Sequence, residues 1–172
     1  MHIWLIGFMG AGKTTLGREA ARLLGLPFTD LDDRIVAAAG KPIREMFETE
    51  GEAAFRSLER QCLVALAGES VPHVVACGGG TPCFGDNMAL IRANGLSVYL
   101  SAPPAVLAAR LAPHRHTRPV LQAMSAETLE EGIRALLETR IPYYAQATLV
   151  FDTSTGSAGD LARLIMQHRA QI

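Results

Sequence analysis

The sequence predicts an α/β fold with a mostly parallel sheet of about five strands in a single domain, residues 1–172. Strand-like and helix-like segments alternate along the chain, and no repeat, low-complexity tract or linker interrupts them. The first strand-like run, "HIWLIG", is apolar at nearly every position. A strand of this kind is typical of a parallel sheet that helices cover on both faces.

Composition and charge narrow the functional classes. Of the 172 residues, 49% are hydrophobic, and 16 basic side chains nearly balance 17 acidic ones, for a net charge of -1. This balance gives no overall field for nucleic acid or an anionic membrane, so any anion site must be local. No apolar run approaches the roughly 20 residues of a membrane span, and the first residues do not resemble a secretion signal. We expect a cytoplasmic monomer with reduced cysteines that binds neither nucleic acid nor membranes.

In the first half of the chain, turn residues separate the expected elements. Lys13 to Leu24 reads as a helix because its apolar residues recur on one stripe, and Gly25 and Pro27 end it. The other elements expected here are the strands His2–Gly7, Pro27–Asp32 and His73–Gly80 and the helices Asp33–Ala39, Pro42–Phe47 and Glu50–Ala67.

The second half continues the alternation. Its expected elements are the strands Leu96–Ser101 and Thr148–Thr153 and the helices Pro104–Leu111, Ala126–Ala145 and Ala158–Gln171. Between the first two of these helices, "APHRHTRPVLQAM" carries two prolines and several basic residues, which predicts a loop.

A phosphate-binding loop follows the first strand. "GFMGAGKT" fits the pattern GxxxxGK[ST], with a strand before it and a helix after it. Glycines let successive N–H groups turn inward toward phosphate oxygens, and the N-terminus of the helix adds its dipole. We expect Lys13 to bridge the β- and γ-phosphates of ATP and the Thr14 hydroxyl to ligate Mg²⁺. The ATP-contacting residues of the loop would be Gly10, Ala11, Gly12, Lys13, Thr14 and Thr15.

Three carboxylates follow at the end of the second expected strand. Because alternate residues of a strand share a side, Asp30 and Asp32 should point together toward the phosphate loop, while Asp33 starts a helix. A carboxylate beside Mg²⁺ and phosphate can hold the water shell of the metal or accept a proton from a hydroxyl. Helix capping alone would explain one of the three.

In order along the chain, these motifs and those that follow resemble the shikimate kinase family. The later motifs are "FR..E", a triple glycine, "RP" and "R.P.Y", which here are Phe55, Arg56 and Glu59; Gly78, Gly79 and Gly80; Arg118 and Pro119; and Arg140, Pro142 and Tyr144. The set spans residues 7–144 and is far more specific than the phosphate loop alone.

The resemblance implies a three-layer αβα P-loop kinase fold with a mobile lid at about residues 112–122 and a substrate-binding helical region at about residues 33–61. It also implies an activity. The protein would use ATP and Mg²⁺ to phosphorylate the 3-hydroxyl of shikimate, a step toward chorismate and the aromatic amino acids.

The resemblance also assigns substrate contacts. Arg56 and Arg140 would hold the shikimate carboxylate, and Asp32 would accept from the ring hydroxyls, including the one that attacks. The turn formed by Gly78, Gly79 and Gly80 would let the ring approach the backbone closely.

Further residues are assigned to the nucleotide. Arg118, on the lid, would join Lys13 and Mg²⁺ in offsetting charge on the transferring group. Arg110 and Thr153 would contact the adenine.

One motif of many P-loop proteins is missing. The third strand, "VVAC", lacks the Walker B aspartate, an absence that shikimate kinases share. We therefore expect metal support from Thr14 and, through water, from Asp30.

Two other functions remain open. Another small-molecule P-loop kinase, such as gluconate kinase, would share the phosphate loop but would not be expected to carry the triple glycine and "R.P.Y". A regulatory GTPase would need an NKxD-type stretch, and neither Asn87 nor Asn94 is followed by lysine.

Overall fold

A computed structural model describes residues 1–117, 121, 124–125 and 127–171. In this part of the chain a five-stranded parallel sheet has the order β2-β3-β1-β4-β5, which confirms the predicted α/β class. The strands are β1 (His2–Ile6), β2 (Phe28–Asp30), β3 (Val74–Ala76), β4 (Gly95–Ser101) and β5 (Leu149–Asp152).

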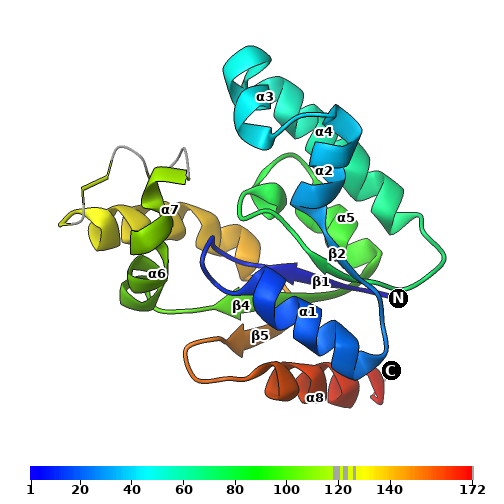
Figure 1. The fold of residues 1–172 in the computed structure, drawn as a ribbon. Helices are drawn as coiled ribbons and strands as arrows, with labels where there is room; N and C mark the ends of the chain where they lie inside the picture. Colours follow the sequence, from blue (N-terminus) through cyan, green and yellow to red (C-terminus); the bar gives the residue numbers. More distant parts are fainter. Residues whose placement is uncertain (118–120, 122–123, 126, 172) are drawn as a thin grey trace.

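Helices cover both faces of the sheet (Figure 1). Helices α1 and α8 pack against each other on one face, and α5 packs on β4 from the other face. The helices are α1 (Lys13–Leu24), α2 (Leu31–Ala39), α3 (Ile43–Thr49), α4 (Gly51–Ala67), α5 (Asn87–Ala93), α6 (Pro104–Leu111), α7 (Leu129–Tyr144) and α8 (Ala158–Arg169). Two short 3-10 helices are η1 (Thr81–Cys83) and η2 (Ala112–Thr117).

The core is built around the apolar first strand, as the sequence predicts. Every residue of β1 is buried, including Trp4, as expected for a central strand covered on both faces. Helix α1 ends at Gly25, which adopts the left-handed conformation with φ 66°, and α8 begins with a capping box between Ser157 and Asp160. The sheet is therefore a rigid platform, and the loops at the carboxyl ends of its strands carry the polar residues.

The boundary between β2 and α2 differs from our prediction. We expected the strand to continue to Asp32, but β2 ends at Asp30 and α2 begins at Leu31. Asp30 is the N-cap, and its Oδ1 accepts from the backbone N–H of Asp32 at 3.1 Å. Strand alternation therefore does not place Asp30 and Asp32 on one side, because Asp32 lies in the first turn of a helix.

Two other segments were predicted wrongly. We assigned no element between Gly80 and Leu96, where η1 and α5 lie. We also expected a loop after α6, but residues 112–117 form η2. Further along the expected lid, Leu121 is buried in the core. Arg118, Pro119 and Gln122 lie outside the described residues, so our expectation of a mobile lid stays a prediction.

In the part of the chain that the structure describes, no helix is both long and apolar enough to cross a bilayer. The cysteines Cys62, Cys77 and Cys83 are free thiols.

A buried histidine joins the start of β1 to the segment before β3. The backbone N–H of His73 donates to Nδ1 of His2 at 3.2 Å, so the proton of the neutral ring is on Nε2, which lies 3.1 Å from the carbonyl oxygen of Glu69. Burial is the largest cause that lowers the pKa of His2 from its ordinary value of 6.5, and the nearby His73 and N-terminal amine lower it further. The carbonyl and carboxylate of Glu69 act in the opposite direction.

This arrangement predicts a loss of stability in mild acid. As the pH falls below 6.5, His2 binds a proton in the unfolded chain before it does so in the folded protein, so the free energy of unfolding should decrease. The decrease should level off once the pH is below the lowered folded-state pKa. Urea unfolding between pH 5 and pH 8 measures this.

His2→Asn is the matched variant, because an amide oxygen can still accept from the N–H of His73 but does not titrate. Its free energy of unfolding should depend less on pH below 6.5 than that of the wild type. Identical pH dependence in the two proteins would contradict the assignment to His2.

Candidate functional site

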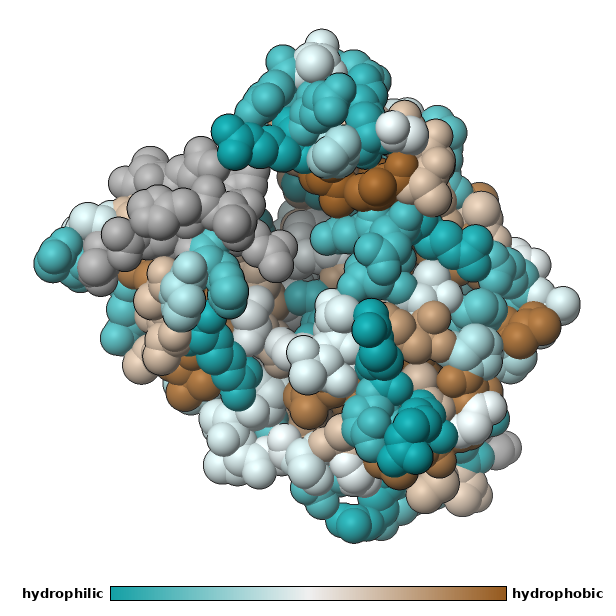
Figure 2. All heavy atoms as spheres, in the orientation of Figure 1, coloured by the Kyte–Doolittle hydropathy of each residue, from teal (hydrophilic) through white to brown (hydrophobic). Residues whose placement is uncertain are grey.

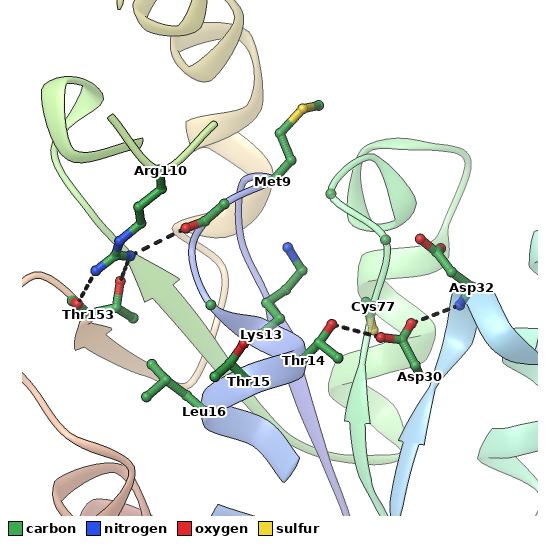
Figure 3. A pocket seen from close by; sticks show the side chains of 14 residues that line it. Met9, Lys13, Thr14, Thr15, Leu16, Asp30, Asp32, Cys77, Arg110 and Thr153 are labelled. Atoms are coloured by element: carbon green, nitrogen blue, oxygen red, sulfur yellow. Dashed lines mark hydrogen bonds between the residues drawn. The ribbon is translucent and has the colours of Figure 1, made fainter. Parts of the chain in front are cut away.

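A cavity of about 500 Å³ lies at the carboxyl ends of β1, β2 and β3 (Figure 3). In the space-filling view the surface is hollowed between the lobe of α3 and α4 and the body of the protein (Figure 2). Most of the residues that the sequence assigned to ATP and metal line this cavity: Gly10, Gly12, Lys13, Thr14, Thr15, Asp30, Arg110 and Thr153. Three residues that it assigned to the substrate also line the cavity: Asp32, Gly78 and Gly79. Met9, Leu16 and Cys77 also line it.

The phosphate loop and the start of α1 line this cavity. Gly10 and Gly12 have φ values of 77° and 90°, a backbone conformation that other residues rarely adopt. Gly12 is the N-cap of α1 and provides no side-chain cap, and the first turn of α1 has no acidic residue. The partial positive charge at this helix end is therefore not neutralised from within, which suits it to a bound phosphate. Ala11, which we also assigned to ATP, is buried and does not line the cavity.

Lys13 is held by the loop that precedes it. Its Nζ donates to the carbonyl oxygens of Gly7 at 2.8 Å and Phe8 at 2.9 Å. These bonds place the ammonium group on the cavity side of the loop, where Figure 3 shows it pointing away from α1. A cation at this position can neutralise phosphate charge without a change in the fold of the loop.

Thr14 and Asp30 place two hydrogen-bonded side-chain oxygens in the cavity that Lys13 also lines. The Thr14 hydroxyl donates to Oδ2 of Asp30 at 2.8 Å, while Oδ1 of Asp30 caps α2 (Figure 3). Hydroxyl and carboxylate oxygens are the ligands that Mg²⁺ prefers, and Mg²⁺ usually keeps several waters of its own. The donor set therefore fits the metal that we expected, although no other carboxylate is supplied by β3.

Cys77 takes the place at the end of β3 where we noted the missing Walker B aspartate. Its side chain is buried, and burial raises the pKa of the thiol, so the group stays protonated and neutral. This position therefore adds no negative charge to the phosphate site.

Arg110 ties the phosphate loop to the loop after β5. Its guanidinium donates to the hydroxyl of Thr153 at 3.0 Å and to the carbonyl oxygens of Thr153 at 2.7 Å and Gly10 at 3.3 Å. Thr153 is itself buried and bonded to the carbonyl oxygen of Ser101. The two residues that we assigned to adenine thus lie together at one end of the cavity (Figure 3).

The triple glycine has a clear structural reason. A Cβ at Gly78 would lie 3.2 Å from Oδ1 of Asp32, one at Gly79 would lie 3.3 Å from Nη1 of Arg140, and one at Gly80 would lie 3.0 Å from Nη2 of Arg56. These distances are tighter than ordinary contacts of a Cβ. We expected the glycines to make room for a substrate ring, and the structure shows that they also make room for three charged side chains of the protein. The turn brings those side chains together.

Arg140 reaches the turn from α7. Its Nη1 is buried and has no hydrogen-bond partner in the described part of the chain. Its Cζ lies 5.2 Å from the centre of the Phe8 ring. A buried cationic donor without an acceptor is costly, so this nitrogen favours an anionic ligand.

Tyr144 fixes the glycine turn from the same helix. Its hydroxyl donates to the carbonyl oxygen of Gly79 at 2.5 Å, and its ring stacks on Tyr99 with centres 5.1 Å apart. Burial raises the pKa of Tyr144, so the hydroxyl remains a donor. Tyr144 belongs to the "R.P.Y" motif, but the motif gave no indication of its hydrogen bond to Gly79.

Arg56 reaches the turn from α4. Its Nη1 donates to Oε2 of Glu59 at 2.8 Å, and Oε1 of Glu59 accepts from the Thr81 hydroxyl at 2.6 Å. Glu59 is almost fully buried, with 1% of its surface exposed. Our sequence analysis gave Glu59 no role, although its i,i+3 spacing from Arg56 on a helix predicts such a pair.

Arg56 and Arg140 of the expected substrate site lie beside the glycine turn, and neither they nor Gly80 of the turn line the 500 Å³ cavity. Arg118 lies outside the described residues, and its placement is not established.

Comparisons with known proteins place this geometry in a family. The sequence model described as "Shikimate kinase" matches residues 9–169. The chain belongs to the shikimate kinase family. A curated shikimate kinase of Parabacteroides distasonis is 45% identical over 151 residues, which cover 88% of this chain and 87% of the relative.

Solved structures of shikimate kinases share the whole fold. The crystal structure of shikimate kinase from Bacteroides thetaiotaomicron matches with a TM-score of 0.88 and 38% identity, and the match covers 100% of this chain and 99% of that one. Shikimate kinase from Acinetobacter baumannii in complex with shikimate matches with a TM-score of 0.87 and 38% identity, over 99% and 93% of the two chains. The three-layer αβα P-loop kinase fold that we predicted is therefore confirmed.

Asp30→Asn tests the metal ligands predicted for this shikimate kinase family member. Asparagine caps helices about as well as aspartate, so the thermal unfolding midpoint should barely change. Loss of the carboxylate charge should raise the Mg²⁺ concentration needed for half-maximal binding of ATP. Calorimetric titration with ATP at several Mg²⁺ concentrations measures this effect.

Without Mg²⁺, nucleotide affinity should differ little between Asp30→Asn and the wild type. An unchanged Mg²⁺ requirement in a folded variant would remove Asp30 from the metal site.

Proposed function

We propose that this protein transfers the γ-phosphoryl group of ATP to the 3-hydroxyl of shikimate, giving shikimate 3-phosphate and ADP in the pathway to chorismate and the aromatic amino acids. The observation that carries this proposal is the glycine turn, where Asp32, Arg56 and Arg140 converge beside the phosphate cavity. Two guanidiniums and one carboxylate complement a ligand that carries a carboxylate and several hydroxyls.

One end of the site binds ATP and the other end binds shikimate. The phosphate loop and Lys13 bind the phosphates, and Arg110 and Thr153 contact the adenine. Arg140 and Arg56 hold the shikimate carboxylate, and the buried Nη1 of Arg140 is the atom that gains most from it. Gly78 and Gly79 line the cavity between these ends, so the two substrates meet at the turn.

Catalysis in this site is a matter of position and charge. Asp32 orients the 3-hydroxyl and takes its proton as the oxygen attacks the phosphorus. Lys13 offsets the charge that spreads over the transferring group, and Arg118 adds to this from the lid, assigned to residues 112–122. Mg²⁺, held by Thr14 and through water by Asp30, would supply further charge neutralisation. The substrate-binding helical region, at about residues 33–61, comprises most of α2, all of α3 and the first part of α4.

Cell location and assembly belong to the same proposal. Free cysteines are typical of a reducing compartment, which supports the cytoplasm. A monomeric assembly is part of the same proposal.

Release of ADP with shikimate, with gluconate and with no acceptor tests the proposal directly. We expect ADP release with shikimate and none with gluconate or without an acceptor. Equal turnover with gluconate would support the other small-molecule kinase, and release without any acceptor would indicate a nucleotidase.

Arg140→Ala should weaken shikimate selectively. Loss of a charge-assisted pair costs about 1.5–3 kcal/mol, which corresponds to an increase of roughly 10- to 200-fold in the KM for shikimate. The KM for ATP should barely change, because Arg140 does not line the phosphate cavity. Steady-state kinetics with each substrate varied in turn measures both constants.

Lys13→Ala should lower turnover rather than the affinity for shikimate. It should remove most turnover in a folded protein while calorimetric binding of shikimate persists.

If Arg140→Ala weakens both substrates equally, Arg140 is not a selective anchor for the carboxylate.

A further inference from the structure

An exposed aromatic ring lies on the guanidinium of Arg56. Phe84 follows η1 directly and is one of the large apolar side chains that remain exposed, with 37% of its surface accessible. The Cζ atom of Arg56 lies 3.7 Å from the centre of the Phe84 ring. Two other arginines over aromatic rings, Arg18 and Arg140, are more distant, at 5.5 Å and 5.2 Å.

The edges of the same guanidinium are held by carboxylates. Nη1 donates to Glu59 at 2.8 Å, and Nε and Nη2 both donate to Oε1 of Glu52 at 3.2 Å. Glu59 is buried, whereas 56% of the Glu52 side chain is exposed. An ion pair as exposed as the one with Glu52 contributes little and exchanges readily. The carboxylates alone therefore fix one edge of the guanidinium and leave its other edge loosely held.

Phe84 and the glycine turn belong to one loop that encloses Arg56. Gly80 lies against Nη1 and Nη2, since a Cβ there would meet them at 3.2 Å and 3.0 Å. Thr81 bonds to Glu59, which bonds to Arg56. Two rings also lie against this guanidinium, and Phe84 is the nearer of them: its centre is 3.7 Å from Cζ, whereas that of Phe55 is 4.9 Å away.

We propose that Phe84 is a positioning residue that keeps the guanidinium of Arg56 in the plane needed to bind the substrate carboxylate. This inference deepens the proposed function and rests on it. The contact combines cation–π attraction with coverage of a flat group, and it restricts rotation of the guanidinium out of the plane of its partners. When the substrate displaces Glu52, the ring of Phe84 still holds that plane.

The proposal fits the exposure of Phe84. Phe84 is only partly exposed, and its ring covers a cation at the proposed binding site. Removing it should not disturb the core, because the ring is not among the buried residues of the core.

Phe84→Ala tests the proposal through kinetics and binding with shikimate. The KM for shikimate and its calorimetric dissociation constant should rise by about 2- to 30-fold, the range of a cation–π contact at partly exposed to desolvated sites. The value of kcat should change less than the KM, and the KM for ATP should stay constant. Phe84→Tyr should retain the affinity of the wild type, and Phe84→Leu should behave more like Phe84→Ala.

Two controls separate positioning from general damage. Val71→Ala removes another exposed apolar side chain, 56% exposed, and should leave the shikimate KM unchanged. In an Arg56→Lys background, which has no flat guanidinium, Phe84→Ala should raise the shikimate dissociation constant by a smaller factor than in the wild type.

The outcomes are distinguishable. A wild-type protein that neither binds nor phosphorylates shikimate would overturn the proposed function itself. If the wild type is active and folded Phe84→Ala binds shikimate with wild-type affinity or tighter, only the role of Phe84 is overturned. An equal effect of Phe84→Ala in the Arg56→Lys background, or full retention of affinity in Phe84→Leu, would also overturn positioning through the guanidinium.

Discussion

Asp32, Arg56 and Arg140 converge because the turn after β3 carries no Cβ atom at three successive positions. These side chains start from three different helices, α2, α4 and α7, and no local sequence contact joins them. An alanine at Gly79 or Gly80 would require the neighbouring atoms to give way by a few tenths of an ångström, and one at Gly78 would also crowd the Thr81 hydroxyl at 2.9 Å. Since binding groups lose much of their effect at such errors, the turn sets the geometry of the whole substrate end.

The phosphate end depends on backbone rather than side chains. Gly10 and Gly12 have positive φ, and α1 begins without a side-chain cap or an acidic first turn, so its dipole and N–H groups are left for a ligand. The two ends meet at Cys77 and Gly78, which follow each other in sequence and both line the cavity. A neutral thiol at this junction supplies no carboxylate, which is why the proposed metal site depends on Thr14 and Asp30.

The sequence was sufficient for the parallel sheet and for most of the site, because buried strands and glycine motifs have strong local signals. It was misleading at Asp30 and Asp32, where a side-chain cap starts a helix two residues earlier than the strand pattern suggests. It missed α5, because this helix has only seven residues and follows Pro82, Gly85 and Asp86, which are typical of turns. It gave no roles to Glu59, Tyr144 and Phe84, because their contacts with Arg56 and Gly79 depend on tertiary packing.

Under the proposed function, the two arginines would favour an acidic substrate for different reasons. Arg56 already has acceptors in Glu52 and Glu59, so a substrate carboxylate there replaces an exposed ion pair and gains only the difference. Nη1 of Arg140 has no acceptor within the described chain, so a carboxylate there satisfies a buried donor that a neutral polyol would leave less well matched. Sites built to pair a buried polar group reject analogues that lack the partner much more strongly than apolar pockets reject a size change. Selectivity for an acid over a neutral sugar alcohol should therefore originate mainly at Arg140, while Arg56 would mainly orient the bound carboxylate.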